Sequence, residues 1–365
     1  MEDMVVDPDF WMGKRVFLTG HTGFKGGWLA HWLKLMGARV TGFALNPPTD
    51  PNLFNSADIG TGLNHILADL RDAEKLKQAI AEARPEIVFH LAAQSLVRRS
   101  YEAPVETFDI NVMGTLNLFE AVRSVAGVSA LVNVTSDKCY ENREWIWGYR
   151  ENEPLGGYDP YSASKACAEI LTASYRRSFF VESVPVATAR AGNVIGGGDW
   201  GEDRLLPDLI RGFTAGQSVL VRNPDAIRPW QHVLDAVSGY LCLAQHLAGS
   251  DGEQFAEAWN FGPDRSSELS VEHIVLRVAR LWGKEACFEL ANRKNGPHEA
   301  VFLKLDSTKA RTQLGWSPGW DIDKTLQTTV EWYRASAQQS ANLAELMSNQ
   351  IQLHQEDAGK SGRNS

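Results

Sequence analysis

The sequence predicts an α/β fold, in which a doubly wound parallel sheet is followed by a smaller, loop-rich C-terminal domain. Two observations predict it. Short apolar runs alternate with segments of helical periodicity over the first half of the chain, as expected for β-α units whose strands are buried on both faces. Beyond residue 190 the sequence becomes rich in glycine, proline and tryptophan, and its helical patterns are shorter.

The strands and helices of the sheet are each marked by the sequence. A first buried strand is expected at residues 15–20, followed by a helix over residues 28–36 that Gly37 ends. A second strand follows directly at residues 39–45. Further strands are expected at residues 64–68, 87–91, 130–134 and 184–189, and further helices at residues 73–83, 112–125 and 161–179.

The chain divides into two expected domains and a tail. Residues 1–190 form the sheet domain, which also receives residues 233–262 as a returning helix and strand. Residues 191–335 mainly form the second domain. Residues 336–365 are polar and end in a run of glycine, serine and charged residues, which predicts a flexible, frayed tail.

The composition and net charge of the chain limit the classes of partner that it is expected to bind. A net charge of −9 over 365 residues argues against a nucleic-acid or anionic membrane partner. No apolar run approaches the ~18 residues of a membrane span, and the acidic start Met1-Glu2-Asp3-Met4 does not resemble a signal peptide. The four cysteines lack CxxC spacing, which predicts reduced thiols in the cytoplasm and no metal site.

A glycine-rich turn joins the first strand to the first helix. It reads Gly20-His21-Thr22-Gly23-Phe24-Lys25-Gly26. Its three glycines allow a tight turn, let the backbone approach a pyrophosphate, and let the helix pack closely on the strand. The helix N-terminus offers free amides to the phosphates. The turn therefore predicts a dinucleotide site in a Rossmann sheet.

Tyr161 and Lys165 lie four residues apart in a segment of helical character, so both side chains are expected on one helix face. A nearby cation lowers the pKa of a phenol from its ordinary ~10 by roughly 1–3 units. The oxidised ring of a nicotinamide cofactor adds a second positive charge. A phenolate at Tyr161 can then take the proton of a sugar hydroxyl as hydride leaves its carbon. Ser136 follows the strand at residues 130–134, at the edge where such sheets bind ligands.

These motifs resemble the extended branch of the short-chain dehydrogenase/reductase superfamily. The resemblance implies a catalytic triad of Ser136, Tyr161 and Lys165. The cofactor-binding residues that it implies are Gly20, His21, Gly23, Phe24, Lys25, Gly26, Asp69, Leu70, Leu91, Ala92, Ala93, Tyr161 and Lys165. NAD is the expected cofactor, but residues 43–46 have neither the acid typical of an NAD site nor an arginine for a 2′-phosphate, so NADP stays open.

Longer segments closely resemble the CDP-glucose 4,6-dehydratases within this superfamily. They are Asp137-Lys138 and residues 145–151, 155–161, 196–200 and 228–233. The resemblance implies that CDP-glucose is oxidised at C4, loses water across C5 and C6, and receives the same hydride back at C6. The second domain then binds the nucleotide sugar. The alternatives are a dehydratase of a dTDP- or GDP-linked sugar and a 4-epimerase.

The resemblance also implies roles for the pair that follows Ser136. Asp137 is expected to protonate the departing C6 hydroxyl. Lys138 stands where other dehydratases carry a glutamate base. A neutral amine can remove the C5 proton, whereas a charged one can stabilise the enolate, and both roles stay open.

The resemblance also implies which residues contact the substrate and how the subunits assemble. The substrate-binding residues that the resemblance implies are Gln94, Asn193, Arg204, Arg228 and His298, although the arginines are also consistent with surface ion pairs. Enzymes of the extended branch usually dimerise through two helices per subunit. The homodimer contacts expected here are Leu116, Phe119, Ile170 and Leu171, and a homotetramer stays open.

Overall fold

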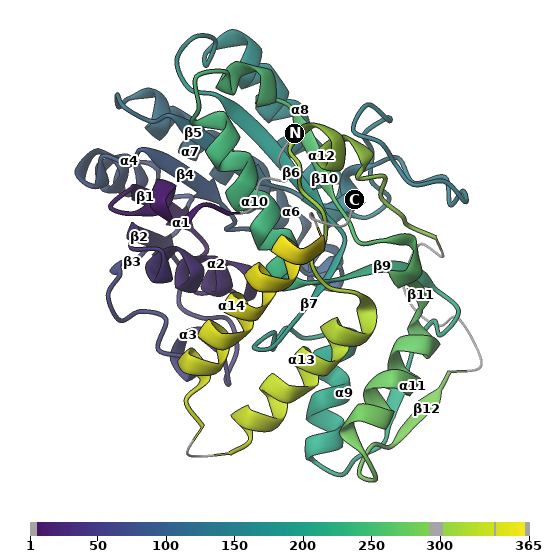
Figure 1. The fold of residues 1–365 in the computed structure, drawn as a ribbon. Coiled ribbons are helices and arrows are strands. Elements are labelled where there is room, and N and C mark those ends of the chain that lie inside the picture. Colours follow the sequence, from purple (N-terminus) through teal and green to yellow (C-terminus); the bar gives the residue numbers. More distant parts are fainter. Residues whose placement is uncertain (1–5, 292–301, 339–340, 362–365) are drawn as a thin grey trace.

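A seven-stranded parallel sheet forms the centre of the molecule, as the sequence predicts (Figure 1). The computed structural model describes residues 6–291, 302–338 and 341–361. The strand order is β10-β6-β5-β4-β1-β2-β3, which is the doubly wound arrangement. The strands are β1 Arg15–Thr19, β2 Arg39–Ala44, β3 Asn64–Leu67, β4 Ile87–His90, β5 Ala130–Val134, β6 Val186–Ala191 and β10 Ala258–Phe261.

Helices cover both faces of this sheet. On one face lie α4 (Ala73–Ala83), α7 (Gly114–Arg123) and α8 (Pro160–Ser178), and on the other lie α2 (Phe24–Leu35) and α10 (Val233–Leu247). Successive strand residues point to opposite faces, so Phe17 belongs to one hydrophobic core while Val16 and Leu18 belong to the other. No helix in the described part of the chain is both long and apolar enough to cross a membrane.

The chain leaves the sheet after β6 and returns to it. Strand β10 pairs with β6 in parallel, and α10 packs against β5 and β6. Two small sheets lie outside the main one, with the orders β11-β9-β7 and β12-β8. Their strands are β7 Asn193–Ile195, β8 Val219–Val221, β9 Ile227–His232, β11 Glu268–Ser270 and β12 Phe288–Leu290. They lie with α9, α11 and α13 in the lower part of Figure 1.

The other helices are shorter or lie outside the central layers. The short helices are α1 Pro8–Trp11, α3 Leu53–Ser56, α5 Val97–Glu102, α6 Pro104–Phe108 and α12 Thr308–Gln313. The longer ones are α9 Leu205–Thr214, α11 Val271–Trp282, α13 Ile322–Ser336 and α14 Leu343–Ser361. A π-helical turn spans Asp109–Met113, and 3₁₀ turns span Asp137–Cys139, Gly252–Phe255 and Arg265–Ser267.

Two helices differ at their N-termini from what their apolar patterns suggest. Helix α2 begins at Phe24 and not near residue 28, because Gly26 and Gly27 belong to its first turn. The helix expected at residues 112–125 is preceded by the π-helical turn, which α7 continues. The dimer contact expected from Phe119 is wrong. Its ring is buried in the subunit's own core against Tyr175 and Phe180, at centroid distances of 5.3 and 5.9 Å.

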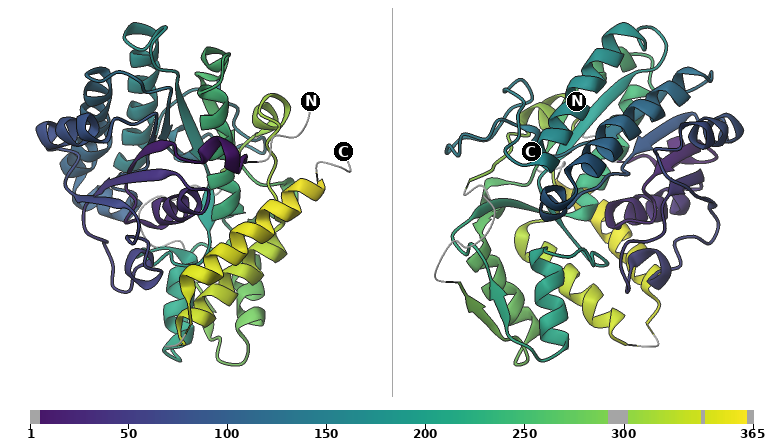
Figure 2. Two further views of the ribbon diagram at one scale, coloured as in Figure 1. Left: turned by 60° about the vertical axis from the view of Figure 1, so that its left-hand side comes forward. Right: turned by 180° about the vertical axis from the view of Figure 1, so that it is seen from behind.

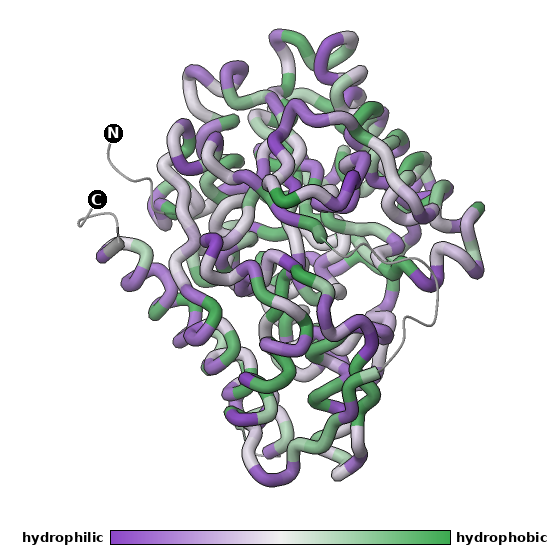
Figure 3. The backbone as a smooth tube through the Cα atoms, turned by 90° about the vertical axis from the view of Figure 1, so that its right-hand side faces the viewer, coloured by the Kyte–Doolittle hydropathy of each residue, from purple (hydrophilic) through white to green (hydrophobic). Residues whose placement is uncertain are grey.

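The C-terminal segment differs from the frayed tail that the sequence predicts. Residues 343–361 form the helix α14, which packs on α2 and α13 along the outside of the molecule (Figure 2). Polar and apolar residues alternate along it (Figure 3), and its apolar residues Met347 and Ile351 are buried. His354 is buried too and lies 2.8 Å from Asp235 of α10. The segment is polar in composition because one face of the helix is exposed to solvent. Packing of the other face, rather than helix propensity, stabilises the helix.

Candidate active site

The glycine turn between β1 and α2 has the shape that a dinucleotide requires. Gly20 has φ +79°, and a Cβ atom there would lie 2.7 Å from the backbone nitrogen of Ala92. A Cβ atom at Gly26 would collide with the carbonyl of Gly20. Gly23 caps α2 without a side-chain hydrogen bond, so the amides of the first turn stay open to phosphate oxygens. The residues present therefore fit a pyrophosphate.

His21 fills the space between this turn and β2. Its ring lies where a side chain at Gly42 would be, and its Nε2 is 2.6 Å from Nδ1 of His65. Burial, followed by the neighbouring His65, lowers the pKa of His21 to about 4, so the ring is neutral at pH 7. The hydroxyl of Thr22 donates to the carbonyl of Leu45 at the end of β2. Residues 43–46, at that end of β2, include no carboxylate and no arginine.

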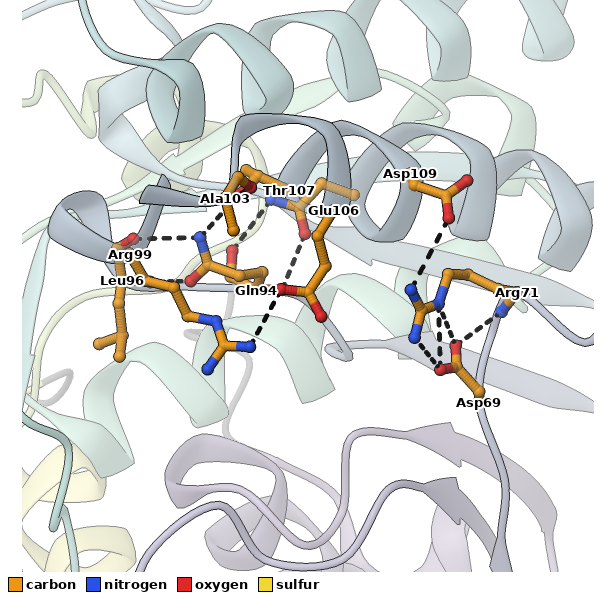
Figure 4. Close-up of polar contacts among 10 residues, drawn as sticks. Asp69, Arg71, Gln94, Leu96, Arg99, Ala103, Glu106, Thr107 and Asp109 are labelled. Atoms are coloured by element: carbon orange, nitrogen blue, oxygen red, sulfur yellow. Dashed lines mark hydrogen bonds and ion pairs between the residues drawn. The ribbon is translucent and has the colours of Figure 1, made fainter. Parts of the chain in front are cut away.

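Asp69, one of the predicted cofactor-binding residues, is held by a neighbouring arginine (Figure 4). Arg71 donates to its carboxylate through Nε and Nη2, at 3.0 and 2.6 Å from Oδ2. These hydrogen bonds lower the pKa of Asp69. Arg71 also lies 3.8 Å from Asp109. Leu70 is buried beside them, and Leu91, Ala92 and Ala93 line the exit of β4 in partly buried positions.

Gln94, predicted to bind substrate, is used within the fold (Figure 4). Its Nε2 donates to Leu96 O and Thr107 Oγ1 at 3.1 and 2.9 Å, and its Oε1 accepts from the amide of Leu96 at 2.6 Å. The side chain is buried. These contacts favour a role in ordering the loop after β4 over a direct contact with substrate.

Asn111 is a buried residue that the sequence analysis missed. It lies in the π-helical turn and donates through Nδ2 to the carbonyl of Gln94 at 2.9 Å and to Ser164 Oγ at 2.8 Å. Ser164 precedes Lys165 on α8, so Asn111 ties the loop after β4 to the helix that carries the predicted triad. A polar residue just before the predicted helix at 112–125 was the only signal for it.

Tyr161, Lys165 and Ser136 meet at the carboxyl edge of the sheet. Both α8 residues are buried, and Lys165 Nζ donates to the carbonyl of Val134 at 3.3 Å. Burial and, to a smaller extent, the nearby Lys25 lower the pKa of Lys165 to about 7. Burial also raises the pKa of Tyr161 to about 12, against the effect of its hydrogen bond with Ser136. The expected lowering of the phenol pKa is thus outweighed by desolvation.

Asp137 and Lys138 begin the 3₁₀ turn that follows Ser136. The Ser136 hydroxyl donates to Asp137 Oδ1 at 3.1 Å and accepts from the amide of Lys138 at 3.2 Å. Asp137 is buried, and its Oδ2 has no hydrogen-bond partner among the described residues. A Cβ atom at Gly192 would lie 3.1 Å from that oxygen. Lys138 is partly buried. The carboxyl group is therefore buried, and one of its oxygens is not used by a hydrogen bond within the described residues.

Arg204, one of the cationic residues predicted to bind substrate, comes from the second part of the chain. Arg204 lies 2.9 Å from Asp199 and donates to Ser95 Oγ at 3.1 Å, so it bridges to the loop after β4. Asp199 raises the pKa of Arg204, which in turn lowers that of Tyr161. Lys25, on the first turn of α2, is close enough for Arg204 to affect it. Its pKa is lowered to about 8, first by burial and then by Arg204.

The other predicted substrate residues lie on the small sheet beside Asp137. Asn193 begins β7 and pairs with Trp230 of β9. Arg228 is buried on β9, and its Nη1 donates to the carbonyl of Ile227 at 2.9 Å. His298 lies outside the described residues. The structure thus brings the triad, the Asp137 turn, Lys25 and Arg204 together at one sheet edge, with Asn193 and Arg228 on the adjoining strands.

Comparison with known proteins gives matches over most of the chain. The family model described as GDP-mannose 4,6 dehydratase matches residues 17–329. The CDP-glucose 4,6-dehydratase of Salmonella typhimurium strain LT2 is 54% identical over 337 residues, which are 91% of this chain and 93% of that protein.

Two solved structures share the fold. A UDP-glucose-4-epimerase from Stenotrophomonas maltophila, with bound NAD and formylated UDP-arabinopyranose, has a TM-score of 0.77 at 24% identity and covers 89% of this chain and 99% of its own. A dTDP-glucose 4,6-dehydratase from Bacillus anthracis, in complex with NAD, has a TM-score of 0.74 at 22% identity and covers 88% and 97%. At these identities the likeness concerns the fold alone.

Proposed function

The chain belongs to the family described as GDP-mannose 4,6 dehydratase, and from that premise we propose that it is a hydro-lyase converting CDP-glucose to CDP-4-keto-6-deoxyglucose and water. The 54% identity to a CDP-glucose 4,6-dehydratase supports the substrate. One observation carries the reaction type. A buried carboxyl group, Asp137, lies directly beside Ser136 in a site with Tyr161 and Lys165, and its Oδ2 has no partner among the described residues. Elimination of water needs an acid in addition to the groups that oxidise an alcohol.

We propose NAD as the cofactor, held by the first-turn amides of α2, by Lys25 and by the exit of β4. Bound NAD supplies the acceptor and later the donor of the transferred hydride, and its positive ring opposes the effect of burial on Tyr161. The first-turn amides of α2, which no side chain at Gly23 caps, support the phosphate contacts. The absence of an arginine at residues 43–46 argues against a 2′-phosphate.

Tyr161 is the base for the C4 hydroxyl in this proposal. Lys165 lies one helical turn away on the same buried face, so its ammonium stabilises the phenolate that forms. Ser136 is hydrogen-bonded to Tyr161 and orients the sugar hydroxyl toward it. The proton thus passes from the sugar oxygen to the phenol oxygen.

Asp137 and Lys138 act on the other side of the ring. The new 4-keto group makes the C5 proton acidic, and Lys138 removes this proton or stabilises the enolate. Asp137 gives its proton to the C6 hydroxyl, which leaves as water. Their adjacency in one 3₁₀ turn supports concerted action at neighbouring carbons.

We assign the pyrophosphate of the substrate to Arg228 and Asn193 on the small sheet and to Arg204. Arginine binds phosphate through its planar donor fork. Arg204 is already paired with Asp199, which partly offsets its positive charge. Its main contribution is therefore to position the pyrophosphate.

The subunit is proposed to form a homodimer through α7 and α8, with a homotetramer as the alternative. Ile170 on α8 is 58% exposed, so an apolar side chain of this helix is available for a contact between subunits. Leu116 on α7 and Leu171 on α8 are partly buried. A solution mass equal to one chain at micromolar concentration would contradict this assembly.

Turnover of nucleotide sugars tests the proposal directly. The purified protein with NAD is incubated separately with CDP-, dTDP-, GDP- and UDP-glucose, and the alkaline absorbance of a 4-keto-6-deoxy product is followed. The proposal predicts product from CDP-glucose at the highest kcat/KM. Preferential turnover of another nucleotide sugar would show that CDP-glucose is not the substrate. Formation of CDP-galactose would show that the reaction is an epimerisation and not an elimination.

A further inference from the structure

A buried ion pair that the proposed chemistry does not use lies beneath the active site. Glu169 is on α8, one turn after Lys165, and Arg190 is on β6. The two side chains are 3% exposed, and Arg190 Nη2 lies 2.7 Å from Glu169 Oε2. Removing two charges from water is costly, and such a pair gives little net stability compared with apolar packing. Its other contacts indicate what it holds.

On one side, Glu169 is hydrogen-bonded to the residue that follows β5. The hydroxyl of Thr135 donates to Glu169 Oε1. Thr135 stands between Val134, whose carbonyl accepts from Lys165, and Ser136. The last residue of β5 and the residue that follows it are thus bonded to two side chains one turn apart on α8. This double contact fixes the register of the helix that carries Tyr161 against the strand that Ser136 follows.

On the other side, Arg190 is hydrogen-bonded to the chain that follows residues 136–139, which we call the acid-base turn. Its Nη1 donates to the Tyr140 hydroxyl at 2.8 Å and to the carbonyl of Glu151 at 3.1 Å. The guanidinium also lies 4.9 Å from the centroid of the Tyr140 ring. The Tyr140 hydroxyl donates in turn to Asn260 Oδ1 on β10, at 2.7 Å. Tyr140 follows the turn Asp137–Cys139 directly.

We propose that the Glu169–Arg190 pair is the positioning element of the acid-base turn, because it anchors both residues that flank Ser136, Asp137, Lys138 and Cys139. This role rests on the proposed function. Within the described part of the chain, Asp137 makes one side-chain hydrogen bond, to its neighbour Ser136, so the backbone of the turn sets the direction of its Oδ2. Tyr161 and Lys165 are placed by α8 itself. Loss of the pair should therefore impair elimination more than oxidation at C4.

The charge of Glu169 also acts on Lys165. Burial lowers the pKa of Lys165, and Glu169 opposes that shift. Without the negative charge, the ammonium of Lys165 is less stable at neutral pH and supports the Tyr161 phenolate less. The acidic limb of the kcat profile should then move to higher pH. A pair that only stabilised the fold would leave this limb in place.

The molecule offers a matched control. Asp235 and His354 form a second buried pair, with exposed fractions of 0% and 2% and a separation of 2.8 Å. Asp235 also accepts from the amide of Gly319 at 2.7 Å. This pair joins α10 to α14 and has no hydrogen bond with residues 135–140. Asp235→Asn therefore perturbs a pair of equal burial without touching the acid-base turn.

The test compares Glu169→Gln with Asp235→Asn in the full chain with NAD. Glutamine keeps an acceptor for Thr135 and the shape of the side chain, but loses the charge that pairs with Arg190. We expect kcat to fall by about 10²-fold, the cost of a misplacement on the order of 1 Å, with KM little changed. Reduced nicotinamide should accumulate near 340 nm, because oxidation outruns elimination. Asp235→Asn should lose thermal stability and keep the wild-type kcat.

Two smaller variants cover the case in which Glu169→Gln does not fold. Thr135→Val removes the hydroxyl on one flank, and Tyr140→Phe removes it on the other. Each should lower kcat and raise the 340 nm absorbance in the same direction. Wild-type kinetics in both, or a Glu169→Gln enzyme that matches Asp235→Asn in kcat and pH profile, would overturn the positioning role alone. A wild-type enzyme that does not turn over CDP-glucose would overturn the proposed function and the role with it.

Discussion

Glu169–Arg190 and Asp235–His354 are hydrogen-bonded pairs of nearly equal burial and length, at 2.7 and 2.8 Å, in two regions of the same molecule. The first lies at the carboxyl edge of the sheet and is bonded to Thr135, Thr188 and Tyr140. The second lies between α10 and α14 and holds the backbone of Gly319. The comparison shows that burial of a charge does not reveal its role, and that the segments bonded to it do. The catalytic region should respond to substitution in kinetics, and the C-terminal region in stability.

The largest effect is expected from Tyr161→Phe. Removal of the phenol hydroxyl removes the base for the C4 hydroxyl, which should lower kcat by ~10⁴-fold, the upper range for a positioned acid-base group. No absorbance should appear near 340 nm, because the first oxidation is blocked. Tyr175→Phe on the same helix is the control, since its hydroxyl is bonded to Glu120 away from the site. Turnover by Tyr161→Phe within tenfold of wild type would place the base elsewhere.

Lys138→Ala should spare the first oxidation and block the second half of the reaction. We expect kcat to fall by about 10²-fold or more, with transient reduction of the nicotinamide. Stopped-flow absorbance at 340 nm separates this variant from Tyr161→Phe. If Lys138→Ala turns over at the wild-type rate, the C5 proton is removed by another group, and the acid-base turn contributes only Asp137.

His354→Gln probes the second region. It removes the imidazole that is hydrogen-bonded to the buried carboxyl group of Asp235, which should cost roughly 1–3 kcal/mol of unfolding free energy. The kcat and KM of the remaining folded enzyme should stay within twofold of wild type. Denaturant unfolding and steady-state kinetics measure the two quantities. A large fall in kcat at unchanged stability would mean that α14 acts on the site, and the contrast between the two regions would fail.

The smallest effect concerns the pH dependence of stability. Burial lowers the pKa of Lys165 from its ordinary 10.5 to about 7. Its destabilising effect is fully present below pH 7 and is relieved as the pH rises from about 7 to 10.5. Lys165→Met should therefore be more stable than wild type at pH 6, on the order of 1 kcal/mol, and the gain should shrink by pH 9. Calorimetry at both pH values checks this, and a gain that grows with pH would contradict it.

The sequence predicted the features that depend on local spacing. The strands, the glycine turn and the pairing of Tyr161 with Lys165 follow from periods of two and 3.6 residues and from glycine geometry. The Glu169–Arg190 contact joins residues that no local pattern relates, so only the packing of α8 on β6 reveals it. The helix α14 was missed because its exposed face dominates the composition. Phe119 was misplaced because an apolar stripe does not tell which neighbour covers it.

Isotopic labelling tests the central claim, an internal transfer of hydride from C4 to C6. CDP-glucose carrying deuterium at C4 is turned over completely, and the product is analysed by NMR and mass spectrometry. The account predicts that the deuterium appears at C6 of the 4-keto-6-deoxy sugar, with none in solvent and none in released cofactor. Deuterium retained at C4 of CDP-galactose, or recovered in stoichiometric reduced NAD, would contradict it.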